Sequence, residues 1–141
     1  MPEITAATGV CIDWGALYNA ARSVLNPTRL NAYVDFGGVG AALVTEAGGV
    51  YTGVCVDTAS SMGMCAEVAA VAAMLTAGET EVVAVVAVDW DGATMPPCGK
   101  CREFFSQLGG DPLVALPGGR IVRLSSLLPE DWKPPTGAVG S

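Results

Sequence analysis

The chain has 141 residues, of which 51% are hydrophobic, and it carries a net charge of −7 at neutral pH. This length and apolar content suit one compact domain with a core of its own and exclude a disordered chain. With seven basic residues and no histidine, the sequence lacks the clustered lysines and arginines of a nucleic-acid-binding surface, so no nucleic-acid partner is expected.

The first predicted elements are a helix and a β-hairpin. Residues 1–12 show no periodicity and are expected to be flexible. Over 13–25 apolar residues recur at helical spacing, and Asn26-Pro27 ends the run. Strand-like segments at 39–45 and 50–56 are joined by a connection that ends in two glycines, which suit a tight hairpin. A loop with serines and a glycine follows.

The rest of the chain alternates helices with strands. Its Val/Ala run before Trp90 is typical of a strand covered on both faces, and Ser126 is a suitable cap for a short closing helix. The predicted ranges are a buried alanine-rich helix over 65–77, a strand over 81–89, a loop over 90–96, a helix over 97–108, strands over 113–116 and 120–124, the closing helix over 125–132 and a flexible tail over 133–141. This order predicts an α/β fold with a single domain over 13–132.

The cysteines and the N-terminal sequence indicate a compartment. No basic segment followed by an apolar core stands at the N-terminus, so no signal peptide is predicted. Five cysteines, an odd number, favour the reducing cytoplasm, where thiols serve as metal ligands or reactive groups rather than disulfides. The longest apolar runs, such as 82–88, are too short to span a bilayer, so no membrane partner is expected.

Three of the cysteines occupy positions that suit one metal ion. Cys98 and Cys101 form a Cys-x-x-Cys pair at the predicted start of one helix, and Cys65 stands at the start of another. The free N–H groups and dipole of a helix N-terminus stabilise thiolates. Three protein ligands with an open fourth position are typical of catalytic zinc. Glu67 lies two residues beyond Cys65, where a proton shuttle would be needed.

The two-part motif Cys65-Ala66-Glu67 and Pro97-Cys98-Gly99-x-Cys101-Arg102 resembles the signature of the cytidine deaminase family. The likeness covers roughly residues 13–132 and includes Leu127-Leu128-Pro129, which is similar to the family's C-terminal Leu-Leu-Pro. It implies a three-layer α-β-α fold with a mixed sheet of about five strands and helices on both faces. Together with the high apolar content, it also implies a homotetramer or, failing that, a dimer.

The resemblance further implies a reaction and the residues that perform it. One Zn²⁺ per chain, held by Cys65, Cys98 and Cys101, lowers the pKa of water, and Glu67 accepts the proton. The activated water attacks the ring carbon that bears the amino group, Glu67 returns protons to a ring nitrogen and to the departing ammonia, and the backbone at Ala66 contacts the amino group. The implied activity is hydrolytic deamination of a cytosine nucleoside or a modified analogue.

The expected substrate contacts depart from the family's pattern. Cys55 stands where the ribose-binding Asn is usual, and Asp57 stands where Glu is usual. Because Asn offers a donor and an acceptor to a hydroxyl while a thiol offers neither well, the sugar is not predicted. Phe36 is the candidate for an aromatic that packs on the ring, since Gly37-Gly38 replaces the family's Phe-Pro.

A second departure concerns the charge of the metal site. Val68 follows Glu67 where many members of the family place Arg, and three thiolates leave a zinc site net negative. Arg102, next to a predicted ligand, is our candidate for the compensating charge beside the ligands. Val68 and Cys101-Arg102-Glu103 are similar to the blasticidin S deaminase branch, which acts on a cytosine nucleoside analogue with an altered sugar.

Three alternatives remain open at this point. A closed structural zinc site would have to recruit Cys55 or Cys11 as a fourth ligand. A thiol-redox protein would use Cys98 and Cys101, and a protein that only binds nucleosides would keep the fold without turnover.

Trp132 is either a packed C-terminal anchor or an aromatic that reaches a neighbouring subunit's pocket, as the resemblance suggests.

Overall fold

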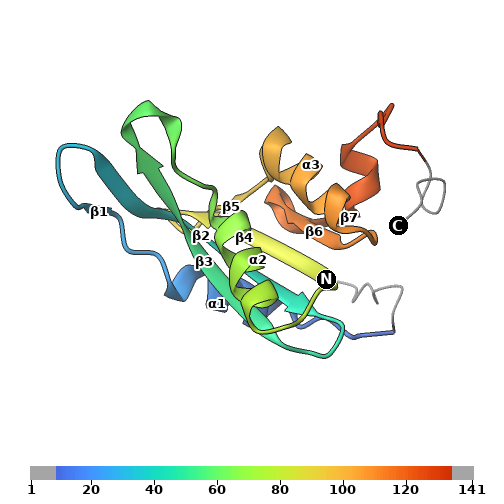
Figure 1. The fold of residues 1–141 in the computed structure, drawn as a ribbon. Coiled ribbons are helices and arrows are strands. Elements are labelled where there is room, and N and C mark those ends of the chain that lie inside the picture. Colours follow the sequence, from blue (N-terminus) through green and yellow to red (C-terminus); the bar gives the residue numbers. More distant parts are fainter. Residues whose placement is uncertain (1–8, 135–141) are drawn as a thin grey trace.

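A computed structural model describes residues 9–134 of the chain as one sheet with helices on both of its faces (Figure 1). In chain order the elements are α1 (Trp14–Ser23), β1 (Thr28–Arg29), β2 (Val34–Thr45), β3 (Val50–Thr58), η1 (Ala59–Ser61), α2 (Ala66–Thr76), β4 (Val82–Asp89), β5 (Thr94–Met95), α3 (Gly99–Leu108), β6 (Leu113–Leu116), η2 (Pro117–Gly119), β7 (Arg120–Arg123) and η3 (Leu124–Leu127). The predicted α/β class is confirmed.

The sheet is mixed, as predicted, but has seven strands rather than about five. Its main path runs β1-β2-β4-β6-β7, while β3 pairs with β2 and β5 pairs with β4. Only β4 and β6 run parallel, and the other pairs are antiparallel. The two additional strands, β1 and β5, are two residues long each, too short for a periodic pattern to reveal them.

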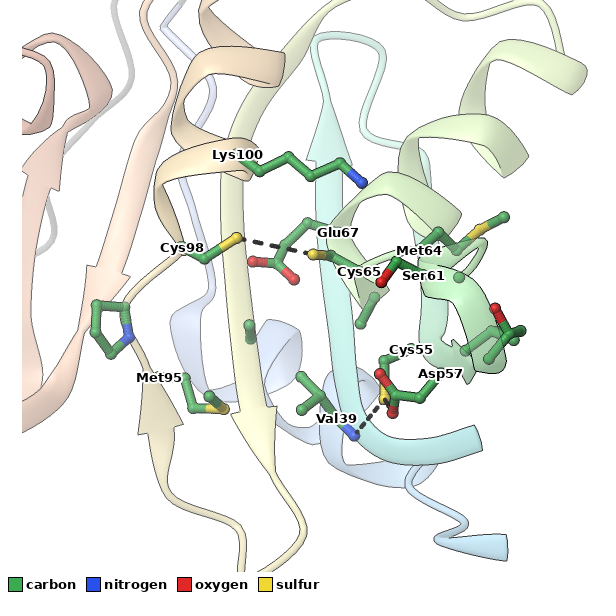
Figure 2. Close-up of a pocket in the computed structure, with 16 residues that line it drawn as sticks. Val39, Cys55, Asp57, Ser61, Met64, Cys65, Glu67, Met95, Cys98 and Lys100 are labelled. Carbon is green, nitrogen blue, oxygen red and sulfur yellow. Dashed lines mark hydrogen bonds between the residues drawn. The ribbon is translucent and has the colours of Figure 1, made fainter. Parts of the chain in front are cut away.

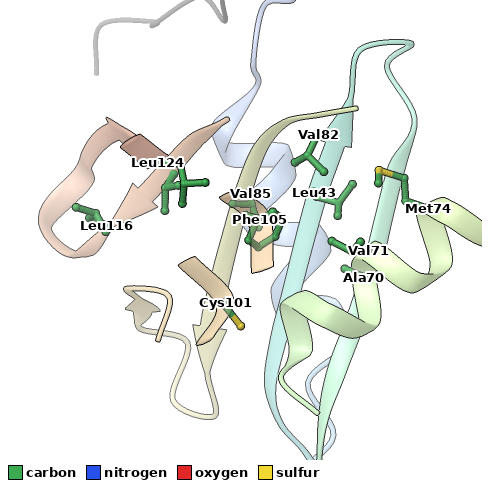
Figure 3. Packing of buried hydrophobic residues seen from close by; sticks show 11 residues of the cluster. Leu43, Ala70, Val71, Met74, Val82, Val85, Cys101, Phe105, Leu116 and Leu124 are labelled. Atoms are coloured by element: carbon green, nitrogen blue, oxygen red, sulfur yellow. The ribbon is translucent and has the colours of Figure 1, made fainter. Parts of the chain in front are cut away.

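Alternate residues of the central strands face two separate cores, which creates the three layers. In β2, Ala42 packs with α1 on one face, whereas Leu43 packs with α2 and α3 on the other. Figure 3 shows the second core, where Leu43 and Val85 of the sheet meet Val71 of α2 and Phe105 of α3. Because β4 contributes buried residues to both cores, its continuous apolar run is explained.

Each face of the sheet uses a glycine to bring a helix close to a strand. A Cβ at Gly40 of β2 would overlap the carbonyl oxygen of Ala21 in α1, and a Cβ at Gly53 of β3 would overlap the backbone of Ala66 and Ala70 in α2. The backbones therefore approach at distances that only glycine permits. The close approach of α2 to β3 fixes the position of the residues at the start of α2.

The predicted closing helix over 125–132 is wrong. The chain forms only the short 3₁₀ segment η3, in which the Ser126 hydroxyl donates to the carbonyl of Arg123 rather than capping a helix. Pro129 accounts for the difference, because proline lacks an N–H and keeps the preceding residue, Leu128, out of the helical region. Trp132 is 73% exposed, and its indole N–H donates to Glu103 at 2.8 Å.

The predicted flexible ends, 1–12 and 133–141, fall largely on residues 1–8 and 135–141, which lie outside the described residues. Within the described part, Ile12 is 3% exposed and belongs to the core on the α1 face. The boundaries 13–132 of the single domain stay a prediction. Between residues 9 and 134, every helix is too short or too polar to cross a membrane.

Candidate active site

The starts of two helices meet at one point beside the sheet. Cys65 is the N-cap residue of α2 and Cys98 is the N-cap residue of α3, both with extended backbone angles, and Cys101 lies in the first turn of α3. The three sulfur atoms all lie within 4.8 Å of one another, and the Sγ atoms of Cys65 and Cys98 are 3.7 Å apart (Figure 2). The structure therefore brings together the three cysteines that the sequence motif selects.

The donor set of this cluster fits zinc. Thiolates are soft ligands that zinc prefers, and the three sulfurs are close enough to share one ion. Among residues 9–134, neither Cys11 nor Cys55 belongs to the group, nor does any carboxylate. Three protein ligands without a fourth are the arrangement of a catalytic rather than a structural zinc site.

The thiols differ in how readily they ionise. Burial raises the pKa of Cys101 strongly and raises the pKa of Cys65 as well. Burial acts in the same direction on Cys98, but hydrogen bonds from the backbone of Cys101 and Lys100 and from neighbouring thiols outweigh it, so the Cys98 pKa is lowered. Two of the three thiols thus need a nearby cation to become thiolates, which suits a metal site.

Glu67 lies in the first turn of α2 and is 5% exposed. Figure 2 shows its carboxylate between Cys98 and Cys65, although it is not part of the ligand group. Burial raises the pKa of Glu67, because a charged carboxylate loses its hydration there. A carboxyl group whose pKa is raised by burial, placed beside three potential metal ligands, is suited both to accept and to return a proton.

A cavity of about 470 Å³ opens directly in front of the cysteines and Glu67. One part of its wall is apolar, and Val39, Ala87 and Met95 contribute to it. The polar side chains around it are those of Asp57, Thr58, Ser61, Glu67 and Lys100. An apolar pocket with a few polar groups beside a metal site suits a small aromatic ring with polar substituents.

Three of the predicted substrate contacts, Ala66, Cys55 and Asp57, line this cavity. The Cys55 thiol is engaged within the protein: its sulfur accepts from the backbone N–H of Val39 at 3.3 Å and lies 3.9 Å from the Asp57 carboxylate, to which it can donate. Cys55 therefore supports the cavity wall and the position of Asp57 and leaves little capacity for a hydroxyl.

The other two predicted site residues lie elsewhere. Phe36 is half-buried in β2, opposite Val56 of β3, and is not among the residues that line the cavity. Arg102 donates to the carbonyl of Pro97 at 2.8 Å and to the carbonyl of Leu127 at 3.4 Å. Its guanidinium thus ties the start of α3 to η3, and no hydrogen bond joins it to a ligand sulfur in the described part of the chain.

Several cavity residues were not selected from the sequence. Met64 and Met95 line the cavity from the segments that precede α2 and α3, and Lys100 reaches it from between two of the cysteines. The position of Lys100 inside the Cys-x-x-Cys pair was a usable signal, since it must lie near the metal cluster. The methionines gave no signal, because a lone Met is usually a core residue.

Comparisons with known proteins agree with this geometry. A family model described as the cytidine and deoxycytidylate deaminase zinc-binding region matches residues 22–116. Cytidine deaminase of Mycobacterium tuberculosis is 34% identical over 122 residues, covering 84% of this chain and 89% of that protein.

Solved structures are similar over nearly the same extent. Cytidine deaminase from Mycobacterium tuberculosis superposes with a TM-score of 0.75 at 31% identity, covering 87% of this chain and 99% of the other. The enzyme from Mycobacterium leprae gives 0.73 at 30% identity, covering 84% and 99%. From its cysteine cluster, its fold and this coverage, the chain belongs to the cytidine and deoxycytidylate deaminase family of zinc-dependent hydrolases.

Proposed function

We propose that the chain removes the exocyclic amino group of a cytosine nucleoside, or of a modified analogue, by hydrolysis and releases ammonia. The observation that carries this proposal is the buried carboxylate of Glu67 beside three clustered cysteines at the base of a cavity. The pairing of a proton acceptor with a three-ligand metal site is what hydrolytic deamination requires.

In this proposal each residue at the base of the cavity has a separate task. Cys65, Cys98 and Cys101 would hold zinc, which would supply the Lewis acidity that makes water nucleophilic. Glu67 would accept one proton from the attacking water and pass it to a ring nitrogen. It would then take the remaining proton of the hydroxyl added to the ring carbon and give it to the amino group, which leaves as ammonia. The backbone of Ala66, buried at the start of α2, contacts the amino group.

Charge favours a substrate without a phosphate group. Asp57 and Glu67 both present carboxylates to the cavity, against the one amine of Lys100 among the described lining residues, and the chain as a whole carries a charge of −7. A phosphorylated substrate would meet these like charges in a partly desolvated site. A neutral nucleoside is therefore the proposed substrate class, in keeping with the relatives that are named cytidine deaminases.

A second candidate is an antibiotic nucleoside deaminase of the blasticidin S type, whose substrate has an altered sugar. Two observations favour it: the internal hydrogen bonds of Cys55, which leave the usual amide contact to ribose unfilled, and Val68 after Glu67. Both candidates share the ring chemistry and differ only in the group attached to the ring.

We further propose that the protein is cytoplasmic and assembles as a homotetramer or dimer. The support for assembly is a group of large apolar side chains that the single chain leaves exposed: Leu30, Tyr33, Val50, Met62, Met64, Leu75, Trp90 and Trp132. Contact with another chain would cover such side chains where they lie together on the surface.

An ultraviolet deamination screen tests the function. Zinc-loaded protein would be incubated with cytidine, deoxycytidine, cytosine, blasticidin S and aminopurine nucleosides, and the loss of absorbance and the release of ammonia would be followed. We expect turnover of at least one cytosine nucleoside, with about one zinc per chain. Zinc-loaded protein that converts none of them would contradict an enzymatic role and favour a binding protein, and near-zero zinc after purification would favour thiol-redox chemistry.

Glu67→Gln is the matched variant for this screen, because it keeps the size and polarity of the side chain. We expect its kcat to fall by a factor of about 10² to 10⁴, which is the usual contribution of a positioned acid-base group, while zinc content stays at the wild-type value. Glu81→Gln, a change just before β4 and outside the cavity lining, is the control. Undiminished ammonia release by Glu67→Gln would remove Glu67 from the mechanism.

A further inference from the structure

Two adjacent serines in the loop after β3 adopt a backbone conformation that their residue type disfavours. Ser60 has a φ of 62° and Ser61 a φ of 56°. Among residues 9–134, Glu130 is the only other non-glycine residue with a positive φ. The left-handed region costs a residue with a side chain about 1 kcal/mol or more and is concentrated at functional sites.

The loop is held in this conformation from both ends. On one side the backbone N–H of Ala59 donates to the carbonyl of Tyr33 at 2.9 Å, which ties the loop to the turn before β2. On the other side Met64 and Val56 exchange two backbone hydrogen bonds, of 2.9 and 3.0 Å. Gly63 allows this approach, because a Cβ there would overlap the Val56 carbonyl. The conformation is thus imposed by the surrounding structure.

The two serines differ in what they face. Ser61 lines the cavity, whereas Ser60 is not among the lining residues. Figure 2 shows the Ser61 hydroxyl on the side of the loop that faces Cys65 and Glu67. It makes no hydrogen bond to any residue in the described range, so both its donor and its acceptor capacity are available to a ligand.

From this geometry we infer that Ser61 binds substrate by hydrogen-bonding a polar group on the sugar-like substituent that the ring carries. The inference rests on the proposed function. Asp57 is acceptor-only when ionised, the Cys55 thiol is used within the protein, and the Thr58 hydroxyl already accepts from the backbone N–H of Met62 at 2.9 Å. The Ser61 hydroxyl lines the cavity with both its donor and its acceptor capacity unused by the described residues, and it lies on the same side of the cavity as Asp57.

Ser61→Ala and Ser60→Ala form a matched pair for the test, because each removes one hydroxyl from a residue with positive φ. Steady-state kinetics would be measured with cytidine, which carries the substituent, and with free cytosine, which lacks it. We expect Ser61→Ala to raise KM for cytidine about three- to tenfold, the range for losing one neutral hydrogen bond. The kcat value should change little, and KM for cytosine should stay at the wild-type value. Ser60→Ala should behave as wild type with both.

A glycine variant separates the hydroxyl from the shape of the loop. Ser61→Gly removes the hydroxyl while accepting the positive φ without strain. We expect it to show the same increase in KM as Ser61→Ala, with one zinc per chain and an unchanged circular dichroism spectrum in all variants. If Ser61→Gly matched wild type, or if both Ser→Ala variants raised KM equally, the loop geometry rather than the hydroxyl would matter and the inference would be overturned.

The outcome for the wild-type protein distinguishes the two proposals. If wild type converts cytidine and the Ser61 variants keep the wild-type KM for it, the inference about Ser61 fails while the proposed function stands. If wild type converts another nucleoside of the screen but not cytidine, that nucleoside and its free base replace the pair. If wild type converts none, the proposed function fails and the inference falls with it.

Discussion

Cys101 is the most deeply buried of the three clustered cysteines, with no exposed surface at all. Its thiol lies inside the core shared by α2, α3 and the sheet. A buried thiol whose pKa is raised by burial is a poor thiolate without a cation. The side chain therefore joins two tasks, as a ligand of the site and as a packing residue of the core.

Replacing Cys101 should separate zinc binding from the rest of the site. We expect Cys101→Ser to lose most of its zinc and all measurable turnover, because two sulfurs and an alcohol bind zinc far more weakly than three thiolates. Metal content would be measured by inductively coupled plasma mass spectrometry. Cys55→Ser is the matched control, since Cys55 lies outside the cluster and should leave zinc at about one per chain. Full zinc content in Cys101→Ser would show that the ion sits elsewhere.

How well single residues were predicted depends on what fixes their positions. The spacing of Cys65, Cys98 and Cys101 around two helix starts depends only on local structure, so the sequence suffices for it. The places of Phe36 and Arg102 depend on strand register and on competing acceptors, the Pro97 and Leu127 carbonyls. Neither is visible in a linear sequence, which is why the sequence did not predict that Phe36 lies outside the cavity lining or that Arg102 donates to two backbone carbonyls.

At the scale of elements, the contact between α2 and β3 should control the active site. Gly53→Ala would force a Cβ into the backbone of α2, which carries Cys65 and Glu67. We expect a loss of about 1–3 kcal/mol of unfolding free energy, typical of overpacking, together with lower kcat, measured by urea denaturation and kinetics. Gly38→Ala in β2, where nothing lies within 4 Å of the added Cβ, is the control. Equal stability of the two variants would contradict the close approach.

A second element contact joins the β2–β3 hairpin to the connection between α2 and β4. Glu79 accepts a hydrogen bond from the Thr45 hydroxyl at 2.6 Å and another from the Tyr51 hydroxyl. These bonds lower the pKa of Glu79 below its usual value. A carboxyl group with a lower pKa in the folded state contributes stability above its unfolded pKa, and that stability is lost as pH falls through its folded pKa.

The loss of folding stability at low pH should therefore depend on Glu79. We expect Glu79→Gln to lower the melting temperature at pH 7 and to reduce its dependence on pH below about 4.5, where an unperturbed Glu protonates. Thermal unfolding between pH 7 and 3 would measure this, with Glu130→Gln as a surface control. An acid limb identical to wild type would show that the two hydrogen bonds do not favour the charged form.

The length and the packing of an element determine whether the sequence predicts it. The helices at 13–25, 65–77 and 97–108 appear with bounds shifted by a few residues, since each has a long periodic or apolar run. The strand at 39–45 extends back to Val34, because its first half pairs with β1 and β3 across a bulge rather than following an apolar pattern. The closing helix fails at Pro129, where a local rule outweighs the apparent pattern.

At the scale of the whole molecule, assembly is the main untested expectation. We expect sedimentation velocity at micromolar concentration to give a tetramer or a dimer, because the lone chain exposes large apolar residues such as Tyr33 (71%) and Trp132 (73%). Tyr33→Glu and Trp132→Glu would place a charge on each of two separate parts of this surface and should weaken association. A wild-type protein that sediments only as a monomer would contradict the expectation.

The origin of the three sulfurs in two different helices has a consequence for the molecule as a whole. An ion bound there joins a segment that follows the first hairpin to one that follows β5, and so acts as a non-covalent cross-link across a loop of more than thirty residues. Because such a link exists only in the native state, removal of the ion by a chelator should shift the folding equilibrium toward the unfolded chain. A cell starved of metal would then lose the protein itself to proteolysis, in addition to losing its catalytic activity.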